Sequence, residues 1–189
     1  MIRIGLVGDI GSGKSYIAKK FGYPVFNADI EVLKIYKKNQ KCYKKLKKFL
    51  SKYITSFPVK KNELSQAIMA NKNNIKKIIK IVHPEVRSSM NNFIKKNKNK
   101  KIIILDIPLL LENKINKKKD VVVFVESKKI KILKRLKKRK NFDKKLINKF
   151  KKIQLTIEYK KKKSQFIVRN NFSNKFLKKD INRVLERIL

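Results

Sequence analysis

A glycine-rich turn near the N-terminus limits the folds open to this chain more than any other segment. The segment Gly8-Asp9-Ile10-Gly11-Ser12-Gly13-Lys14-Ser15 fits the pattern G-x-x-x-x-G-K-[ST] at every fixed position. It follows the apolar run Ile2–Val7 and leads into Lys14–Phe21, which has helical character. A buried strand, a glycine-rich turn and a helix in this order predict a loop that binds the phosphates of a nucleoside triphosphate (a P-loop).

The chemistry of this loop follows from its backbone. Glycines let several N–H groups point inward at anionic oxygens, and the N-terminus of the following helix adds positive potential. Lys14 is then expected to reach the β- and γ-phosphates, and the Ser15 hydroxyl to bind Mg²⁺. The alternative is a chance glycine-rich turn. The residues expected to contact ATP are Gly11, Ser12, Gly13, Lys14, Ser15 and Tyr16.

The rest of the chain alternates apolar runs with amphipathic segments. Short strands separated by helices predict right-handed crossovers and a mostly parallel sheet. The expected fold is α/β, a three-layer P-loop NTPase fold with about five parallel strands and a helical insertion. The expected strands are Ile2–Val7, Pro24–Asn27, Lys101–Asp106, Val121–Val125 and Gln165–Val168.

Residues 40–100 are rich in Lys and Asn, with apolar residues at helical spacing, which predicts an insertion of several short helices. The helix expected over Lys128–Lys140 is followed by a highly charged stretch with a weaker apolar stripe. We therefore expect one P-loop domain over residues 1–189. Its expected parts are a core of 1–38, 101–140 and 164–189, a helical region of 39–100 and a charged region of 141–163.

The charge is extreme, because 53 Lys and Arg residues oppose 13 Asp and Glu residues and give a net charge of +40. Such a chain is expected to bind nucleic acid non-specifically at low salt. Lys is spread along nearly every polar stretch, which favours a compositional bias over a specific nucleic-acid site. A selected interaction with RNA, acidic partners or a membrane surface is the alternative.

Other classes are disfavoured by what the sequence contains. A single Cys42 excludes a disulfide framework, and a single His83 excludes a multi-histidine metal site. No run approaches the roughly 18 apolar residues of a membrane span, and no signal peptide is apparent. We expect a cytoplasmic protein with no membrane partner. Asn116–Asp120 has one residue too many for the guanine-reading N-K-x-D pattern, which disfavours a GTPase.

Further segments narrow the prediction. They are Gly5–Ser15, Val25–Ile30 (similar to D-A-D), His83–Arg87 (similar to H-P-x-V-R), Leu105–Glu112 (similar to D-x-P-L-L-x-E), Leu136–Arg139, Gln154 and Asn170. In order and spacing, from end to end, they resemble the dephospho-coenzyme A kinase family, a family of small P-loop kinases. The resemblance implies a single P-loop kinase domain, with residues 39–100 as a helical substrate-binding insertion and residues 141–163 as a helical lid.

This resemblance implies transfer of a phosphoryl group from ATP, with Mg²⁺, to the ribose 3′-hydroxyl of dephospho-coenzyme A, the last step of coenzyme A synthesis. The implied partners are these small molecules, with no specific nucleic acid. The oligomeric state is not encoded in any recognisable pattern. A nucleoside monophosphate kinase and an RNA-binding protein that retains a P-loop are the rival interpretations.

The resemblance also implies roles for individual residues. Asp29, just after the second strand, is expected to accept or orient the acceptor hydroxyl; a helix N-cap is its alternative. Asp106 is a candidate Mg²⁺ ligand, with a turn or cap role before Pro108 as the alternative. Arg139 is expected to neutralise the transferring phosphoryl or stack on adenine. The family usually has Asp directly after this Arg, where Lys140 stands here.

The remaining candidates are expected to bind substrate or adenine. Arg87, on a helix that Pro84 is expected to open, suits the substrate pyrophosphate, or is a surface cation. His83 is expected to cap or pack rather than act as a base. Pro108, Leu109 and Leu110 are expected to form an apolar wall with Glu112 as a polar anchor, or else ordinary core; Asn170 is expected to hydrogen-bond adenine, or to be a turn residue.

Two further departures from the family pattern stand near the expected site. Asn27 replaces the first Asp of D-A-D, and Asp9 stands where the family often has Gly. A carboxylate beside a phosphate loop repels ATP unless it points away.

Overall fold

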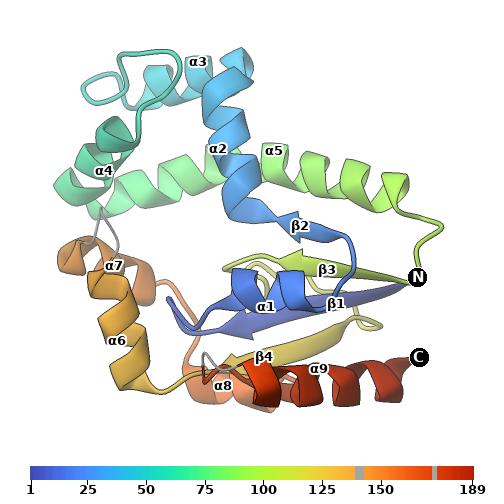
Figure 1. The fold of residues 1–189 in the computed structure, drawn as a ribbon. Helices are drawn as coiled ribbons and strands as arrows, with labels where there is room; N and C mark the ends of the chain where they lie inside the picture. Colours follow the sequence, from blue (N-terminus) through green and yellow to red (C-terminus); the bar gives the residue numbers. More distant parts are fainter. Residues whose placement is uncertain (139–142, 172–173) are drawn as a thin grey trace. The chain divides into compact units, whose positions relative to one another are not determined.

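The structure is a computed structural model, and it describes residues 1–138, 143–171 and 174–189. The chain divides into two compact units, residues 1–27 with 97–189 and residues 28–96. The elements are, in chain order, β1 (Ile2–Gly8), α1 (Lys14–Lys20), β2 (Val25–Asn27), α2 (Ala28–Lys38), α3 (Gln40–Phe49), α4 (Lys61–Ala70), α5 (Lys72–Lys96), β3 (Ile102–Asp106), β4 (Val121–Glu126), α6 (Lys129–Lys137), α7 (Lys144–Lys151), α8 (Ile157–Lys162), β5 (Phe166–Arg169) and α9 (Asn174–Ile188) (Figure 1).

The first unit is built on a five-stranded sheet in the order β2-β3-β1-β4-β5. Every pair is parallel, with Gly5 of β1 opposite both Leu105 of β3 and Val122 of β4. The central strands are largely apolar because both faces of such a sheet are covered. The exception in β1 is Arg3, which is buried and pairs with Asp120 at 2.8 Å. The predicted parallel sheet of about five strands is confirmed.

Helices cover the two faces of this sheet and give three layers. On one face Ile4 and Leu6 of β1 share a buried cluster with residues of α1 and α9, including Ile17 and Ile181. The short helix α8 packs against β1 as well. The predicted three-layer α/β arrangement is confirmed. The lid expected over 141–163 thus includes a helix, α8, that contacts the central strand of the sheet.

The carboxyl ends of the five parallel strands lie along one edge of the sheet, where ligands of open α/β sheets bind. The turns that leave this edge begin with the phosphate loop after β1. Asn27 and Asp106 are the last residues of β2 and β3, and Ser127 and Asn170 directly follow β4 and β5. All four are polar residues at the ends of strands that are largely apolar.

The second unit consists of α2, α3, α4 and α5. The long helix α5 packs against the other three, and it buries Ile75, Ile78, Val82 and Met90. The predicted helical insertion is confirmed. Helix α2, which lies within the residues 1–38 predicted as core, groups in the structure with the helices that it packs against, α3 and α5.

Pro84 was expected to open a helix, but it lies inside the 25-residue helix α5. That prediction is wrong. Proline inside a helix removes one backbone hydrogen bond and is a helix breaker by its intrinsic propensity. Here the buried apolar stripe continues on both sides of it, from Val82 to Met90. Packing of this stripe against three helices outweighs the local preference of a single residue.

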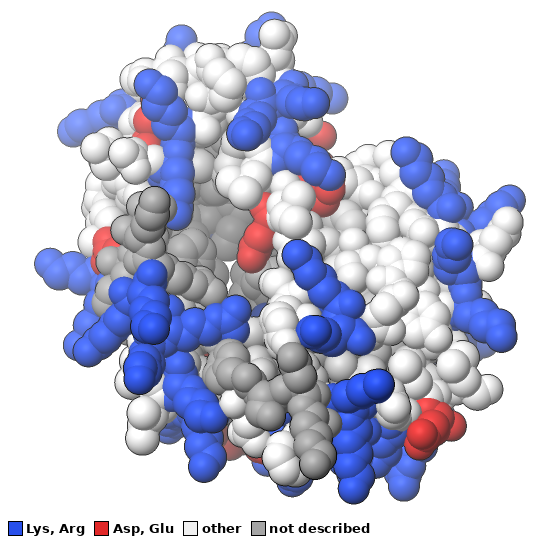
Figure 2. All heavy atoms as spheres, in the orientation of Figure 1, with Lys and Arg blue, Asp and Glu red and all other residues white. Residues whose placement is uncertain are grey.

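Lys and Arg side chains are spread over the visible face and do not gather into one patch (Figure 2). This distribution fits a compositional bias in solvent-exposed positions. Among the described residues, no helix is both long and apolar enough to cross a membrane.

Candidate active site

The phosphate loop is held by a close approach between two strands. Gly8 ends β1 opposite Val125 of β4, and a Cβ at Gly8 would lie 2.7 Å from the Val125 carbonyl oxygen. The loop then turns through Gly11 at a φ of 84° and Gly13 at a φ of 91°. Both values lie in the left-handed region that favours glycine. The sequence pattern therefore matches a real steric requirement at these positions.

Lys14 begins α1 and turns back over the loop. Its Nζ donates to the carbonyl oxygens of Asp9 at 2.9 Å and Gly8 at 3.3 Å. The Asp9 carboxylate accepts from the backbone N–H of Ile10 at 2.7 Å. The Lys14 ammonium thus lies at the start of the loop. The Asp9 carboxylate is held by the backbone N–H of the next residue.

The carbonyl oxygen of Ser12 fixes the far side of the loop to two other strands. It accepts from Ser127 Oγ at 2.9 Å and from Asn170 Nδ2 at 2.8 Å. Asn170 is 0% exposed, and its backbone N–H donates to the Glu126 carbonyl. The structure therefore gives Asn170, a predicted adenine ligand, a loop-supporting contact. Ser127 was not predicted, although a polar residue directly after a buried strand is the available signal.

A second polar group lies where β2 and β3 end. Asn27 and Asp106 are register partners, and Asn27 Nδ2 donates to Asp106 Oδ2. The same nitrogen donates to Ser15 Oγ at 3.4 Å. Both predicted metal ligands, Ser15 and Asp106, are therefore bonded to one amide. A hydroxyl and a carboxylate are hard oxygen donors of the kind that Mg²⁺ takes.

Helix α6 contacts the loop from the other side. A Cβ at Gly11 would lie 3.0 Å from Leu136, and a Cβ at Gly13 would lie 2.8 Å from a guanidinium nitrogen of Arg135. Arg135 was not predicted. The signal that could have identified it is the scarcity of arginine in a chain where lysine supplies most of the positive charge. The predicted Arg139 lies outside the described residues. Tyr16, a predicted ATP contact, packs its ring against the core and under Lys20 Nζ, 5.3 Å from the ring centre.

The turn after β3 contacts both the core of the sheet, through Leu110, and the segment 155–160, through Glu112. Leu110 is buried and contacts Gly5 of β1, so it belongs to the core, as its alternative interpretation expected; Pro108 and Leu109 are half-buried. Glu112 Oε1 pairs with Lys160 Nζ at 2.9 Å and accepts from the Leu155 N–H at 3.1 Å.

Lys160 is the feature of this turn that the sequence concealed. It is 2% exposed, and its Nζ also donates to Gln154 Oε1 at 3.0 Å. A charge buried this deeply must be paired. The pair therefore fixes Glu112 to the segment 154–160. Nothing in a run of four lysines, 160–163, distinguishes the one that is buried.

The other predicted residues lie in the helical unit. Asp29 is exposed in the first turn of α2, which begins at Ala28, so Asp29 is not the N-cap that was its alternative role. Within its own unit it favours the helix start, since an acid there offsets the macrodipole.

His83 and Arg87 are four residues apart on α5, so they lie on one face of that helix. Arg87 is exposed and His83 is half-buried. Burial, and secondarily the charge of Arg87, lowers the pKa of His83 below its usual value. A lowered pKa favours the neutral imidazole, which leaves Arg87 as the positive group of this face.

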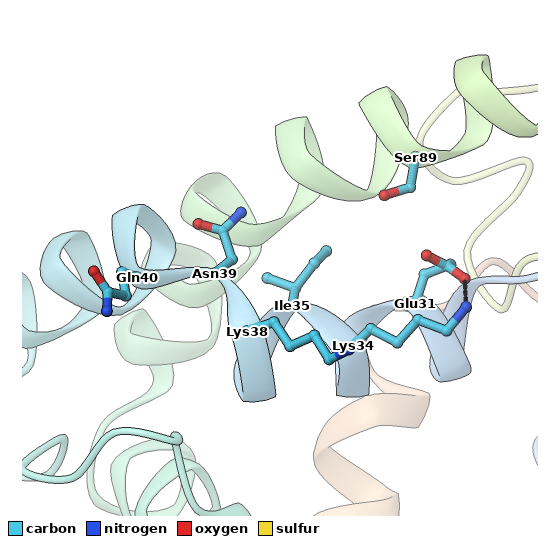
Figure 3. Close-up of a pocket in the computed structure, with 7 residues that line it drawn as sticks. All are labelled: Glu31, Lys34, Ile35, Lys38, Asn39, Gln40 and Ser89. Carbon is cyan, nitrogen blue, oxygen red and sulfur yellow. Dashed lines mark hydrogen bonds and ion pairs between the residues drawn. The ribbon is translucent and has the colours of Figure 1, made fainter.

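An open cavity in the helical unit lies between α2, the start of α3 and α5, with a volume of about 380 Å³ (Figure 3). In it Lys34 Nζ pairs with Glu31 Oε1 at 2.6 Å. None of the predicted site residues lines it. The lining residues are Glu31, Lys34, Ile35, Lys38, Asn39, Gln40 and Ser89.

Comparisons with solved structures support the fold. A protein from Thermus thermophilus, TT1252, superposes with a TM-score of 0.80 at 22% identity over 100% of this chain and 98% of that one. Dephospho-CoA kinase from Campylobacter jejuni gives a TM-score of 0.63 at 24% identity over 98% and 96%. Shikimate kinase from Acinetobacter baumannii gives 0.51 at 12% identity over 100% and 93%. At these identities the likeness supports the fold alone, a three-layer α/β P-loop fold.

Comparisons of sequence establish the family. Dephospho-CoA kinase of Wolbachia pipientis wMel is 32% identical over 98% of this chain and 97% of its own length. The enzyme of Fusobacterium nucleatum is also 32% identical over 98% and 97%. The sequence profile of the dephospho-CoA kinase family matches residues 2–175. Together with the phosphate loop and the polar strand ends, these matches show that the chain belongs to the dephospho-CoA kinase family.

Proposed function

We propose that this chain transfers the γ-phosphoryl group of ATP to the ribose 3′-hydroxyl of dephospho-CoA and releases CoA and ADP. Family membership supports the reaction. The observation that carries the assignment of residues is the phosphate loop, where Gly11 and Gly13 adopt left-handed conformations and Lys14 folds back over the turn. A cytoplasmic location is part of the proposal.

The loop residues bind the phosphates. Backbone N–H groups of the loop and the start of α1 supply fixed positive potential where phosphate oxygens bind. Lys14 exchanges its two carbonyl partners for the β- and γ-phosphate oxygens. Because these groups are positioned before ATP binds, they stabilise developing charge with little reorganisation.

The residues at the ends of α1 and β3 fit a magnesium ion. Ser15 and Asp106 would hold it, since both offer oxygen donors and both bond the same Asn27 amide. When bound, Mg²⁺ neutralises charge on the β- and γ-phosphates. Arg135, against Gly13, adds positive charge from the side of α6. Arg139, which lies outside the described residues, is proposed to neutralise the transferring phosphoryl group.

Asp29 handles the acceptor. Its carboxylate takes the proton of the 3′-hydroxyl as that oxygen forms its bond to the γ-phosphorus, and the bond from phosphorus to the bridging oxygen breaks to release ADP. Arg87 binds the pyrophosphate of dephospho-CoA, with His83 beside it. Pro108 and Leu109 contact the substrate, and Glu112 holds their turn through its pair with Lys160.

The test is acceptor-dependent ADP release by the purified protein with ATP and Mg²⁺. We expect turnover with dephospho-CoA and none above background with adenosine monophosphate. The product should gain one phosphate at the ribose 3′ position, as phosphorus NMR can determine. A folded sample that binds ATP but shows equal turnover with and without dephospho-CoA would refute the proposal.

A further inference from the structure

Asn27 occupies a position that the reaction scheme above does not assign. It is the last residue of β2, and its register partner Asp106 is the last residue of β3, so parallel pairing places the two residues at the same end of adjacent strands. Asn27 Nδ2 donates to Asp106 Oδ2 and to Ser15 Oγ. One amide thus connects three elements, β2, β3 and α1.

The partner makes this contact consequential. Asp106 is 3% exposed, and a buried carboxylate is costly unless hydrogen-bond donors surround it. A carboxamide offers two N–H donors and no charge, whereas a carboxylate offers acceptors only. An acid at position 27 would place two acceptor-only groups against each other, which is unfavourable without a cation between them. The amide therefore holds Asp106 in place with no ion required.

We propose that Asn27 is a positioning residue of the magnesium site: its carboxamide orients Asp106 beside Ser15 and restricts that site to a single carboxylate. This inference rests on the proposed function in that Ser15 and Asp106 are taken as the ligands of Mg²⁺. It assigns to the free protein a site that is arranged by a hydrogen bond, and hence a weak dependence of its stability on divalent cations.

The first experiment changes the number of carboxylates. In nucleotide-free protein without metal, Asn27→Asp should have a lower Tm than the native chain. Millimolar Mg²⁺ should then raise the Tm of Asn27→Asp by about 3 °C more than it raises the Tm of the native chain, because a metal that binds only the folded state stabilises it. The control is Asn182→Asp, which adds the same charge on an exposed position of α9. Equal Mg²⁺ responses in all three proteins would overturn the proposal.

The second experiment removes the amide and measures ADP affinity, so its result does not depend on the Tm measurements of the first. Asn27→Ala leaves Asp106 without this donor, so Mg²⁺ should increase the affinity for ADP about tenfold less than it does in the native chain. Calorimetric titration of ADP with and without Mg²⁺ measures that factor, which a merely structural role would leave unchanged. An unchanged factor in Asn27→Ala would overturn the proposal even if Asn27→Asp fails to fold. Neither titration uses dephospho-CoA, so a failure here is distinct from a failure of the acceptor assay.

Discussion

Two regions carry polar residues that the sequence analysis identified as candidates: the strand ends of the first unit and helix α5 of the second unit. These residues differ in how deeply they are buried. At the strand ends, Asp106 and Asn170 are almost fully buried, and backbone or side-chain hydrogen bonds hold them. On α5, Arg87 is exposed and His83 is half-buried. A substitution at the strand ends is therefore expected to have a structural cost, whereas one at the exposed Arg87 of α5 is expected to have little effect on stability.

The largest expected effect is the loss of kcat in Lys14→Ala, in the phosphate loop. Removing one preorganised donor from developing charge costs about 10²- to 10³-fold in kcat. Steady-state kinetics should show this loss while circular dichroism and Tm remain near native values. Lys19→Ala, an exposed lysine of the same helix, should keep kcat within about twofold. Equal turnover of Lys14→Ala and native protein would contradict the role of the loop.

The buried ion pair offers the next largest effect, on stability. Lys160→Met leaves Glu112 buried beside the sheet without its partner, and breaking such a pair costs about 3 kcal/mol or more. Urea unfolding measures this cost. The matched control is Lys161→Met, whose pair with Glu126 is exposed at 48% and 38% and is worth about 1 kcal/mol at most. Similar losses in the two variants would show that burial does not distinguish these pairs.

Two glycines separate backbone strain from steric contact. Gly13 and Gly22 have φ values of 91° and 76°, but only Gly13 faces other side chains, those of Asn170 and Arg135. Gly22→Ala should cost about 1 kcal/mol from the left-handed conformation alone. Gly13→Ala should cost more in urea unfolding and should also weaken ADP binding. Equal stability losses with intact ADP binding would mean that the loop tolerates a side chain.

On the helix side, Arg87→Ala should raise the KM for dephospho-CoA about tenfold, since a hydrogen bond to a charged group is worth about 1.5 kcal/mol. The KM for ATP and the Tm should change little, because the side chain is exposed. Lys96→Ala removes the same charge from α5 about half a turn around its axis. If both variants raise the KM equally, net charge and not position explains the effect.

The smallest effect concerns acid stability of the helical unit. Burial raises the pKa of Glu63, but hydrogen bonds from Thr55, Lys60 and Ser56 outweigh it and lower the pKa to about 2. A lowered carboxyl pKa contributes stability above the unfolded value, 4.5, and that stability is lost as the pH falls toward 2.

Glu63→Gln should therefore lower Tm by about 2 °C at neutral pH and flatten the fall of Tm between pH 5 and 3. Differential scanning calorimetry over this range checks the slope. Glu186→Gln, on the exposed side of α9, is the control. A native slope in Glu63→Gln would show that these hydrogen bonds do not favour the ionised form.

Much of the fold could be predicted because its signals are local. A run such as Ile102–Leu105 has no polar interruption, which only a strand covered on both faces accommodates, and the phosphate loop is a contiguous motif whose glycines meet φ requirements in place. The long helix α5 could not be predicted, because proline disfavours a helix locally and only the packing of Ile78, Val82 and Met90 overrides that preference.

By itself the sequence determined the strands, the parallel sheet, the phosphate loop and the family, since periodicity and contiguous motifs act over a few residues at a time. Only the tertiary structure decided which polar side chains become partners. Asn27 meets Asp106 across 79 positions of chain, and Ser12 meets Asn170 across 158. It also decided which lysine is buried, because Lys160 reaches Glu112 only once α8 packs against β1. Such pairings depend on strand order and helix packing, and no local pattern records them.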